Sequence, residues 1–308
     1  MPNIILVYQP TKMAMSDYQT IAAAIAEKRP DIKTFIVDTK ETNWAEAEKV
    51  SQDPTITISP LPIKKFKPPR GPIFEGYEWP KGQQYEWLRE IGVSVPDWVE
   101  ITPDLILDPE KWGPYVVVKP ELGRRGAEVR IKRTERVRHK PQSAYVENHP
   151  GSKGAMLAQH FVYTGRWAVN YRVATLFGKT LFCWRCEIDH SFPPLESRNE
   201  FGGGGVTIVS NKKSSRYTLA DDKEVIALAE RVHEVFPNQP LLGSDIVRDA
   251  DTGELYVLEA SPRGDAWYMS SDTGYEIQSA NDIDLTKQFG ALEIATEMLI
   301  EKALEAAR

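Results

Sequence analysis

Residues 243–263 read GSDIVRDADTGELYVLEASPR, a pattern that predicts two antiparallel strands joined by a tight turn. The turn would fall at 249–253, where Asp and Gly residues suit a reversal of the chain. Each predicted strand carries an acid, Asp245 in the first and Glu259 in the second. Acids so placed can meet on one face of a hairpin, and converging oxygen donors suit Mg²⁺. A solvated pair of acids is the commoner reading, so the interpretation depends on the rest of the chain.

Residues 116–129 form a second informative stretch, VVVKPELGRRGAEV. It predicts a strand that ends at Lys119, a glycine-containing loop at 123–126 and a returning strand. Glycines let backbone N–H groups close around phosphate oxygens, and a strand-end lysine supplies a positive charge for them. The stretch is not a Walker A loop, because it lacks GxxxxGK[ST] before a helix. Taken alone, the same residues also fit a simple hairpin turn.

The rest of the chain divides into two parts with different strand patterns. Up to about residue 60, apolar runs alternate with helical patterns, which predicts a small parallel α/β unit. Ser16 or Asp17 would cap its first helix, and Asn43 its second. From residue 115 onward the strands come in neighbouring pairs with Gly-rich connections, as in an antiparallel α+β domain. The outline is completed by a predicted linker at 61–79, a helix at 81–91 and a C-terminal helix at 284–307.

Composition is that of an ordinary globular protein. The 308 residues include 38 Lys+Arg and 44 Asp+Glu, and a net charge of −6 argues against a protein that mainly coats nucleic acid. No apolar run approaches the roughly 18–20 residues of a membrane-spanning helix, and the start lacks the pattern of a cleaved leader, so we expect a cytoplasmic protein. Cys183 and Cys186 lie three apart in a predicted strand and would point to opposite faces, which favours ordinary strand residues over a redox or zinc pair.

The order of these features resembles that of the ATP-grasp superfamily: a strand-end lysine, a glycine loop, a hinge strand, and an Asp and a Glu on a late hairpin. The similarity covers about residues 83–263 and also rests on LAQHFV at 157–162 and YRVATLFGKTLFCWR at 171–185. It implies an α/β plus α+β fold, in which a two-lobed ATP-grasp domain follows a small parallel α/β domain. The implied parts are an N-terminal pre-ATP-grasp domain with its linker at 1–80, a connecting helical segment at 81–114, a small lobe or lid at 115–162, and a large lobe with the metal site and C-terminal helix at 163–308.

The resemblance also implies which residues meet the nucleotide. Lys119 would touch the phosphates, and Lys81 is a candidate for the family's earlier phosphate lysine. The lid over the phosphates would be the loop of Gly123, Arg124, Arg125 and Gly126. The hinge that reads the adenine edge would consist of Gln159, His160, Phe161 and Val162, with the ring of His160 in a structural role.

Further implied roles concern the metal and the ribose. Asp245 and Glu259 would hold Mg²⁺, with Mn²⁺ as an alternative. Ser261 stands where the family usually has Asn, so it would bind the metal weakly or through water. The ribose contact has no assigned residue, because the positions where some members carry an acid are here Trp167, Ala168 and Asn170.

Three arginines are the implied catalytic residues. Arg172 or Arg185 would neutralise the charge of the phosphoryl group as it develops. Arg263 follows the metal segment directly after Pro262, and in similar ligases an arginine there holds the acid substrate or the acyl phosphate. A guanidinium fork suits a carboxylate, which agrees with that role.

The resemblance implies an ATP-dependent ligase that forms C–N bonds. A small-molecule or peptide carboxylate would be activated as an acyl phosphate and passed to an amine or another nucleophile, with ATP and Mg²⁺ as cofactors. Neither nucleic acid nor a membrane is an expected partner. A kinase on the same fold, a non-catalytic nucleotide-binding protein and an interaction protein with chance motifs stay open as alternatives. The glycines at 202–205 fit a substrate-covering loop and a plain turn equally well.

Overall fold

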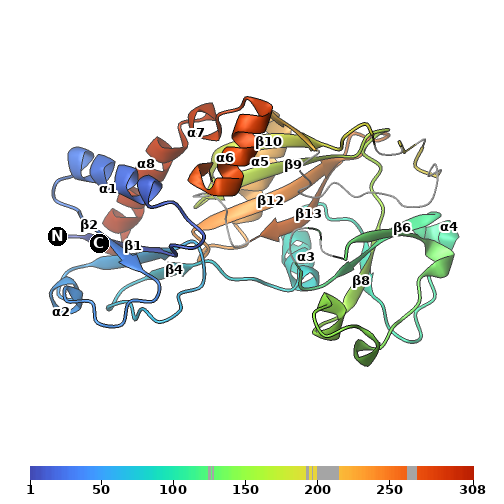
Figure 1. The fold of residues 1–308 in the computed structure, drawn as a ribbon, viewed down its shortest axis with the longest axis horizontal. Coiled ribbons are helices and arrows are strands. Elements are labelled where there is room, and N and C mark those ends of the chain that lie inside the picture. The colour runs from blue at the N-terminus through green and yellow to red at the C-terminus, as the bar shows by residue number, and fades with distance from the viewer. Residues whose placement is uncertain (124–125, 127, 192–193, 196, 200–214, 262–268) are drawn as a thin grey trace.

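Three sheets lie in a row along the long axis of the molecule (Figure 1). An N-terminal sheet is followed by a central five-stranded sheet and then by a four-stranded small lobe, and both chain ends lie at the N-terminal sheet. The computed structural model describes residues 1–123, 126, 128–191, 194–195, 197–199, 215–261 and 269–308. Within these residues no helix combines the length and the apolar character needed to cross a membrane.

The N-terminal sheet is parallel, as predicted. Its unit contains β1 (Asn3–Tyr8), α1 (Met15–Lys28), β2 (Lys33–Asp38), α2 (Ala47–Val50), β3 (Thr55–Ser59) and β4 (Ile73–Glu75). The strand order is β2-β1-β3-β4, and every neighbouring pair is parallel. Residues 4–7 of β1 are almost fully buried, because helices and loops cover both faces of such a sheet.

Two local predictions for this unit are wrong. β4 lies within the predicted linker at 61–79 and extends the sheet by pairing with β3. A strand of three residues is too short to show a hydrophobic period, so the sequence did not indicate it. Asn43 does not cap α2, because that helix begins at Ala47 after Glu46.

The predicted cap of α1 is also wrong. The helix begins at Met15, directly after Ala14, so that Ser16 and Asp17 lie inside its first turn. The Asp17 carboxylate is buried and accepts a hydrogen bond from Ser270 Oγ, which comes 253 residues later in the chain. Burial raises the pKa of this carboxyl. A distant tertiary contact therefore uses the side chain that local pattern assigned to a cap.

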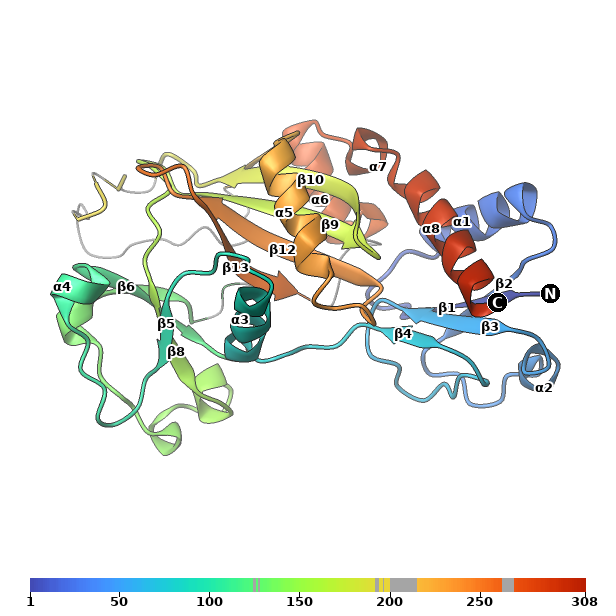
Figure 2. The same cartoon turned by 180° about the vertical axis from the view of Figure 1, so that it is seen from behind.

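The central sheet is antiparallel and carries helices on both faces. Its elements are β9 (Val169–Leu176), β10 (Lys179–Glu187), β11 (Arg216–Leu219), α5 (Lys223–His233), β12 (Leu241–Arg248), β13 (Leu255–Ser261), α6 (Asp272–Asn281), α7 (Leu285–Gln288) and α8 (Ala291–Ala306). The strand order is β11-β10-β9-β12-β13. α5 packs on one face, while α7 and α8 pack on the other (Figures 1 and 2). α8 also contacts α1, which joins the N-terminal unit to the central sheet.

The single C-terminal helix predicted over 284–307 is two helices. α7 ends at Gln288 and α8 begins at Ala291, and Gly290 between them adopts a left-handed conformation with φ of 74°. The Gln288 side chain accepts a hydrogen bond from the Cys183 N–H at 2.9 Å and donates to the Cys183 carbonyl at 3.0 Å. This contact fixes α7 against β10. The apolar stripe continues from α7 into α8, so the sequence did not reveal the break between the two helices.

The small lobe is built on a four-stranded antiparallel sheet of order β5-β8-β6-β7. The lobe and the helix before it contain α3 (Lys81–Glu90), β5 (Trp98–Glu100), α4 (Pro109–Trp112), β6 (Tyr115–Pro120), β7 (Arg130–Arg133), three short 3₁₀ turns and β8 (Met156–His160). α3 agrees with the helix predicted over 81–91. β5 pairs with β8, so this sheet already begins within the segment 81–114 that the sequence assigned to a helical connection.

The two cysteines lie on opposite faces of β10, as predicted. Cys183 packs among apolar side chains on the α5 side, whereas Cys186 belongs to the cluster on the α8 side. Both thiols are free and buried, and burial raises the pKa of Cys183 to about 12 and that of Cys186 to about 11. Thiols with such pKa values are poor nucleophiles and poor metal ligands at neutral pH.

We expect the double variant C183A/C186A to fold and to bind as much metal as the wild type. Removing two small buried groups leaves small cavities, so the melting temperature should fall by several degrees without loss of the fold. Metal analysis after exposure to zinc, together with thermal unfolding, checks this. A stoichiometric zinc ion that is present in the wild type and absent from the variant would contradict the structural role.

Candidate functional site

The two acids of the hairpin face each other beside a break in the strand ladder. Asp245 of β12 pairs directly with Glu259 of β13, whereas the next residue, Ile246, pairs with Val257. Leu258 is therefore the extra residue of a β-bulge. Its carbonyl accepts hydrogen bonds from two side chains outside the sheet, which belong to α3 and β6. The bulge thus presents a backbone acceptor of the central sheet to the neighbouring lobe.

Lys119 connects the small lobe to this bulge. It lies near the end of β6, its side chain is buried, and its Nζ donates to the Leu258 carbonyl at 3.2 Å and to the Tyr85 hydroxyl at 2.6 Å. Tyr85 is a fully buried residue of α3, and its hydroxyl donates to the same carbonyl at 2.5 Å. Three segments that are distant in the sequence therefore meet at one backbone oxygen.

The buried position of Lys119 changes its acid–base behaviour. Burial, together with the positive charge of Lys81, lowers its pKa from 10.5 to about 7, although Glu259 and Asp245 act in the opposite direction. The phenol of Tyr85 stays protonated, because burial raises its pKa. Near neutral pH the amine of Lys119 is therefore divided between its two forms, and an anion beside it would favour the ammonium form.

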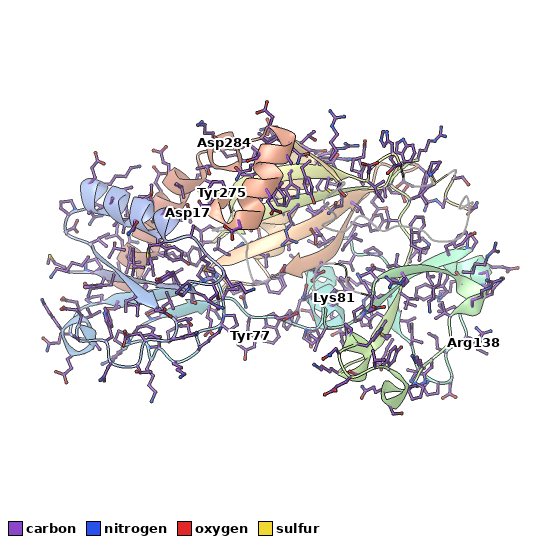
Figure 3. All side chains as sticks on the ribbon, viewed as in Figure 1. Asp17, Tyr77, Lys81, Arg138, Tyr275 and Asp284 are labelled. Atoms are coloured by element: carbon purple, nitrogen blue, oxygen red, sulfur yellow. The ribbon has the colours of Figure 1, made fainter. Side chains whose placement is uncertain are left out.

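In the described part of the chain, a cation lies beside each acid of the pair. At the start of α3, Lys81 Nζ lies 3.4 Å from Glu259 Oε1 and donates to the carbonyl of Gly123 at 3.1 Å. Arg172 Nη1 of β9 lies 2.9 Å from Asp245 Oδ2. Like charges directly across a ladder repel, so the two contacts offset the repulsion within the acid pair. Figure 3 shows Lys81 on α3, between the central sheet and the small lobe.

The two arginines expected at the phosphoryl group lie on different faces of the central sheet. Arg172 is paired with Asp245 on one neighbouring strand and with Trp184 on the other, so these three side chains share a face. Arg185 follows Trp184 and points to the opposite face, where its Nη2 lies 2.5 Å from Glu187 Oε2. The structure therefore brings Arg172 to the acid pair but not Arg185.

The acid pair presents oxygen atoms that a divalent cation could use. Ser261 lies two residues after Glu259 on the same strand face and pairs with Gly243. Among the described residues, no group of three or more His, Cys, Asp or Glu side chains could hold a metal ion by itself. Two carboxylates and a hydroxyl suit Mg²⁺, which completes its shell with water and phosphate oxygens, and they do not suit Zn²⁺.

The expected hinge lies where β8 leaves the small lobe. Gln159 is buried directly opposite Trp98 of β5, and the indole Nε1 of Trp98 is buried without a hydrogen-bond partner in the described part of the chain. The N–H of His160 already donates to the carbonyl that precedes β5, at 2.7 Å. Phe161 and Val162 are buried and follow after the end of the strand.

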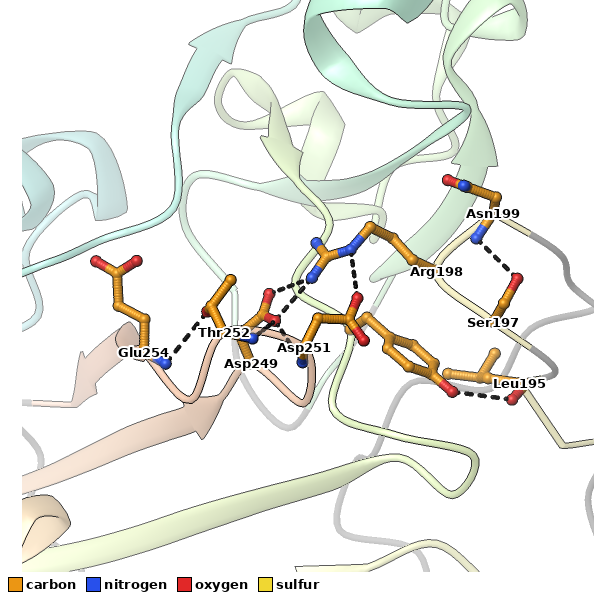
Figure 4. Close-up of polar contacts among 9 residues, drawn as sticks. Leu195, Ser197, Arg198, Asn199, Asp249, Asp251, Thr252 and Glu254 are labelled. Atoms are coloured by element: carbon orange, nitrogen blue, oxygen red, sulfur yellow. Dashed lines mark hydrogen bonds and ion pairs between the residues drawn. The ribbon is translucent and has the colours of Figure 1, made fainter.

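A polar cluster that the sequence did not indicate holds the hairpin turn beside the hinge (Figure 4). Arg198 Nη2 lies 2.7 Å from both carboxylate oxygens of Asp249, and Arg198 Nε lies 2.9 Å from Asp251 Oδ2. Burial alone would raise the pKa of the Asp249 carboxyl, but the Arg198 contact holds it below its usual value. The Ala250 N–H donates to the Tyr163 carbonyl at 2.8 Å, so the turn is fixed to the segment that follows the hinge.

Some expected site residues lie outside the described part of the chain. They are Arg124 and Arg125 of the lid loop, Arg263, and the glycines at 202–205. Gly126 of the same loop is described, and its φ of 65° lies in the left-handed region that favours glycine.

Two residues of the site were missed by the sequence analysis. Tyr85 lies four positions after Lys81, so the helical period already predicts that the two side chains share a face of α3. Leu258 acts through its backbone carbonyl, and a bulge has no side-chain signature that sequence could show.

The comparisons with known proteins bear on the fold. No protein-family model matches the sequence, and no curated protein matches it. Among solved structures, D-alanine–D-alanine ligase from Bacillus anthracis is 15% identical, with a TM-score of 0.51 and coverage of 100% of this chain and 99% of that one. D-cycloserine synthetase DcsG is 14% identical, with a TM-score of 0.52 over 96% of this chain and 99% of that one. The ATP-grasp ligase PsnB, in complex with a minimal precursor, is 13% identical, with a TM-score of 0.52 over 98% and 100%.

The chain has the ATP-grasp fold. The two-lobed arrangement predicted from the sequence is thereby confirmed, with the central sheet as the large lobe and the N-terminal sheet before it. Within this ATP-grasp fold, Lys119 approaches from the small lobe, and the acid pair lies on β12 and on the edge strand β13 of the large lobe.

We expect a pH titration of Lys119, monitored by NMR of labelled lysine side chains, to give a pKa near 7, because the ammonium group is desolvated. Lys81→Met should raise that pKa, since it removes a positive charge that disfavours protonation. Lys179→Met, at an exposed lysine of β10, is the matched control and should leave the titration unchanged. A midpoint near 10.5 for Lys119 in the wild type would contradict its burial against Tyr85 and Leu258.

Proposed function

We propose that the chain is an ATP-dependent ligase, which activates a carboxylate as an acyl phosphate and passes the acyl group to an amine or another nucleophile. The observation that supports this most is the contact of Lys119 with Leu258, in the hairpin that carries the Asp245–Glu259 pair. A lysine and paired acids from two lobes suit the phosphates and the metal of a nucleotide. In support, PsnB, which shares the fold, has been seen with a minimal precursor, Mg and ADP.

The donor set of the acid pair fits a magnesium ion. Asp245 and Glu259 would hold it directly, and Ser261 through water. Such an ion supplies positive charge beside the phosphoryl group. With the two acids engaged in this way, Arg172 and Lys81 can direct their N–H groups to phosphoryl oxygens, since charge-assisted hydrogen bonds to an anion are strong.

The small lobe would bind the rest of the nucleotide. Lys119 and Lys81 would contact phosphate oxygens, and the loop at 123–126 would cover them. The adenine would lie against residues 159–162, beside the buried N–H of Trp98. Because the pKa of Lys119 is about 7 without an anion, binding of the phosphates at pH 8 should be accompanied by proton uptake.

Substrate activation needs no nucleophile from the protein in this proposal. The carboxylate attacks the transferred phosphoryl group, and the protein contributes position and charge. Arg263 would orient the carboxylate through its guanidinium fork. We propose a small-molecule or peptide carboxylate, in line with similar folds: DcsG is a D-cycloserine synthetase, and the macrocyclase MdnC was seen with a precursor peptide.

The proposal is tested by ADP release in Mg²⁺ and ATP across a panel of carboxylic acids, with and without hydroxylamine. A hydroxamate that forms only in the presence of enzyme, ATP and one acid supports acyl phosphate chemistry. A stable phosphorylated product with no hydroxamate would instead identify a kinase. Absence of ADP release with every acid, together with absence of MgATP binding, would refute the proposal.

We expect Glu259→Gln to lower turnover at least about 100-fold, because loss of even an outer partner of a metal costs about 10–100-fold. Ser261→Ala should lower it only about 10-fold, the lower end of that range, since a neutral hydroxyl is a poor Mg²⁺ ligand and would contact the ion through water. Steady-state ADP release by the two variants, with melting temperatures to confirm folding, makes the comparison. Equal losses would show that Ser261 is a full metal ligand.

A further inference from the structure

Gly243 occupies a crowded position on the face of the acid pair. It lies two residues before Asp245 on β12, with Ala174 opposite on β9 and Ser261 opposite on β13. A Cβ atom at Gly243 would lie 2.6 Å from Arg172 Nη2 and 2.7 Å from both its Cζ and its Nε. These distances are far below van der Waals contact, so the guanidinium of Arg172 lies directly against the bare Cα.

The backbone itself does not require glycine at this position. Gly243 is absent from the residues with positive φ, so any L-residue could adopt its conformation. A glycine inside a strand also has a conformational cost that alanine would avoid. The nearest atoms that a side chain at residue 243 would meet all belong to the guanidinium of Arg172.

This contact fixes where the charge of Arg172 lies. The guanidinium is held on one side by Gly243 and at Nη1 by Asp245 Oδ2, at 2.9 Å. Its side chain is only 16% exposed. A guanidinium carries five N–H donors in a planar fork, so it can bind Asp245 and a neighbouring anion together.

We propose that Gly243 is a positioning residue. Its bare Cα lets the guanidinium of Arg172 lie against the acid pair, where the guanidinium faces the phosphoryl group being transferred. The identity of the phosphoryl group as the anion rests on the proposed function, whereas the position of the Arg172 guanidinium against Gly243 does not. The three atoms nearest to an alanine Cβ at 243 all lie at the far end of one long side chain. The fold should therefore survive, and the guanidinium should be displaced.

The test compares Gly243→Ala with Arg172→Ala, with the double variant G243A/R172A, and with Gly154→Ala as a control. A Cβ atom at Gly154 would meet nothing within 4 Å, and its φ is not positive, so this substitution should change nothing. Removing one donor to a developing oxyanion costs about 10²–10³-fold in kcat. We expect such a loss of ADP release from Gly243→Ala and from Arg172→Ala, with KM for MgATP within about threefold of wild type.

The double variant decides whether Gly243 acts through Arg172. We expect its kcat to be no lower than that of Arg172→Ala alone, because the guanidinium that Gly243 positions is already absent. If the kcat losses of the two single variants multiply in the double variant, the two residues act independently and the proposal is overturned. A wild-type kcat for Gly243→Ala would also overturn it. If Gly243→Ala does not fold, folding of the double variant would confirm the clash, and failure of both would show that the backbone needs the glycine.

A second readout does not depend on ligase activity. The Nε–H resonance of Arg172, assigned by its loss in Arg172→Lys, should shift in Gly243→Ala and stay in place in Gly154→Ala. An unchanged chemical shift of this resonance in Gly243→Ala would overturn the positioning role of Gly243. If the wild type neither binds MgATP nor releases ADP, the proposed function fails, and this spectrum still decides whether Gly243 positions the guanidinium.

Discussion

The carbonyl of Leu258 is a point of direct contact between the two lobes. Because a bulge leaves this residue without a partner on β12, its oxygen is available to the Tyr85 hydroxyl and the Lys119 ammonium. Lys119 is buried with these two hydrogen-bond partners, and its low pKa follows from that burial. The same bulge lies beside Glu259, so the geometry that joins the lobes also sets the distance between the lysine and the acids.

Charge balance contributes to the stability of this arrangement. Two acids directly opposite on a ladder repel, and Arg172 and Lys81 each neutralise one of them. The same four charges suit the proposed reaction, because acids that bind a metal leave two cations beside the transferred phosphoryl group. Gly243 adds a steric condition to this balance, since its bare Cα determines where one of those cations lies.

The sequence predicted the parts of the site that are encoded locally. Lys119 at a strand end and the acids on a hairpin are recognisable from a few neighbouring residues, and strand alternation correctly separated the two cysteines. Contacts between distant segments were not predictable in this way. Asp17 bonds Ser270 across 253 residues and Arg198 bonds Asp249 across 51, so neither leaves a local pattern. The alternation of side chains between the two faces of a sheet could also have placed Arg185 and Arg172 on opposite faces, but only once the register of β9 and β10 was known.

The account is tested most directly by calorimetric titration of the protein with MgATP. The wild type and the exposed-lysine control Lys179→Met should each bind one nucleotide, whereas Lys119→Met should bind it at least about 10-fold more weakly, which corresponds to about 1.4 kcal/mol. Proton uptake at pH 8 should accompany binding to the first two and be lost in the third. Equal affinity of Lys119→Met and wild type, or no binding by the wild type, would contradict a nucleotide site at the Lys119–Leu258 junction.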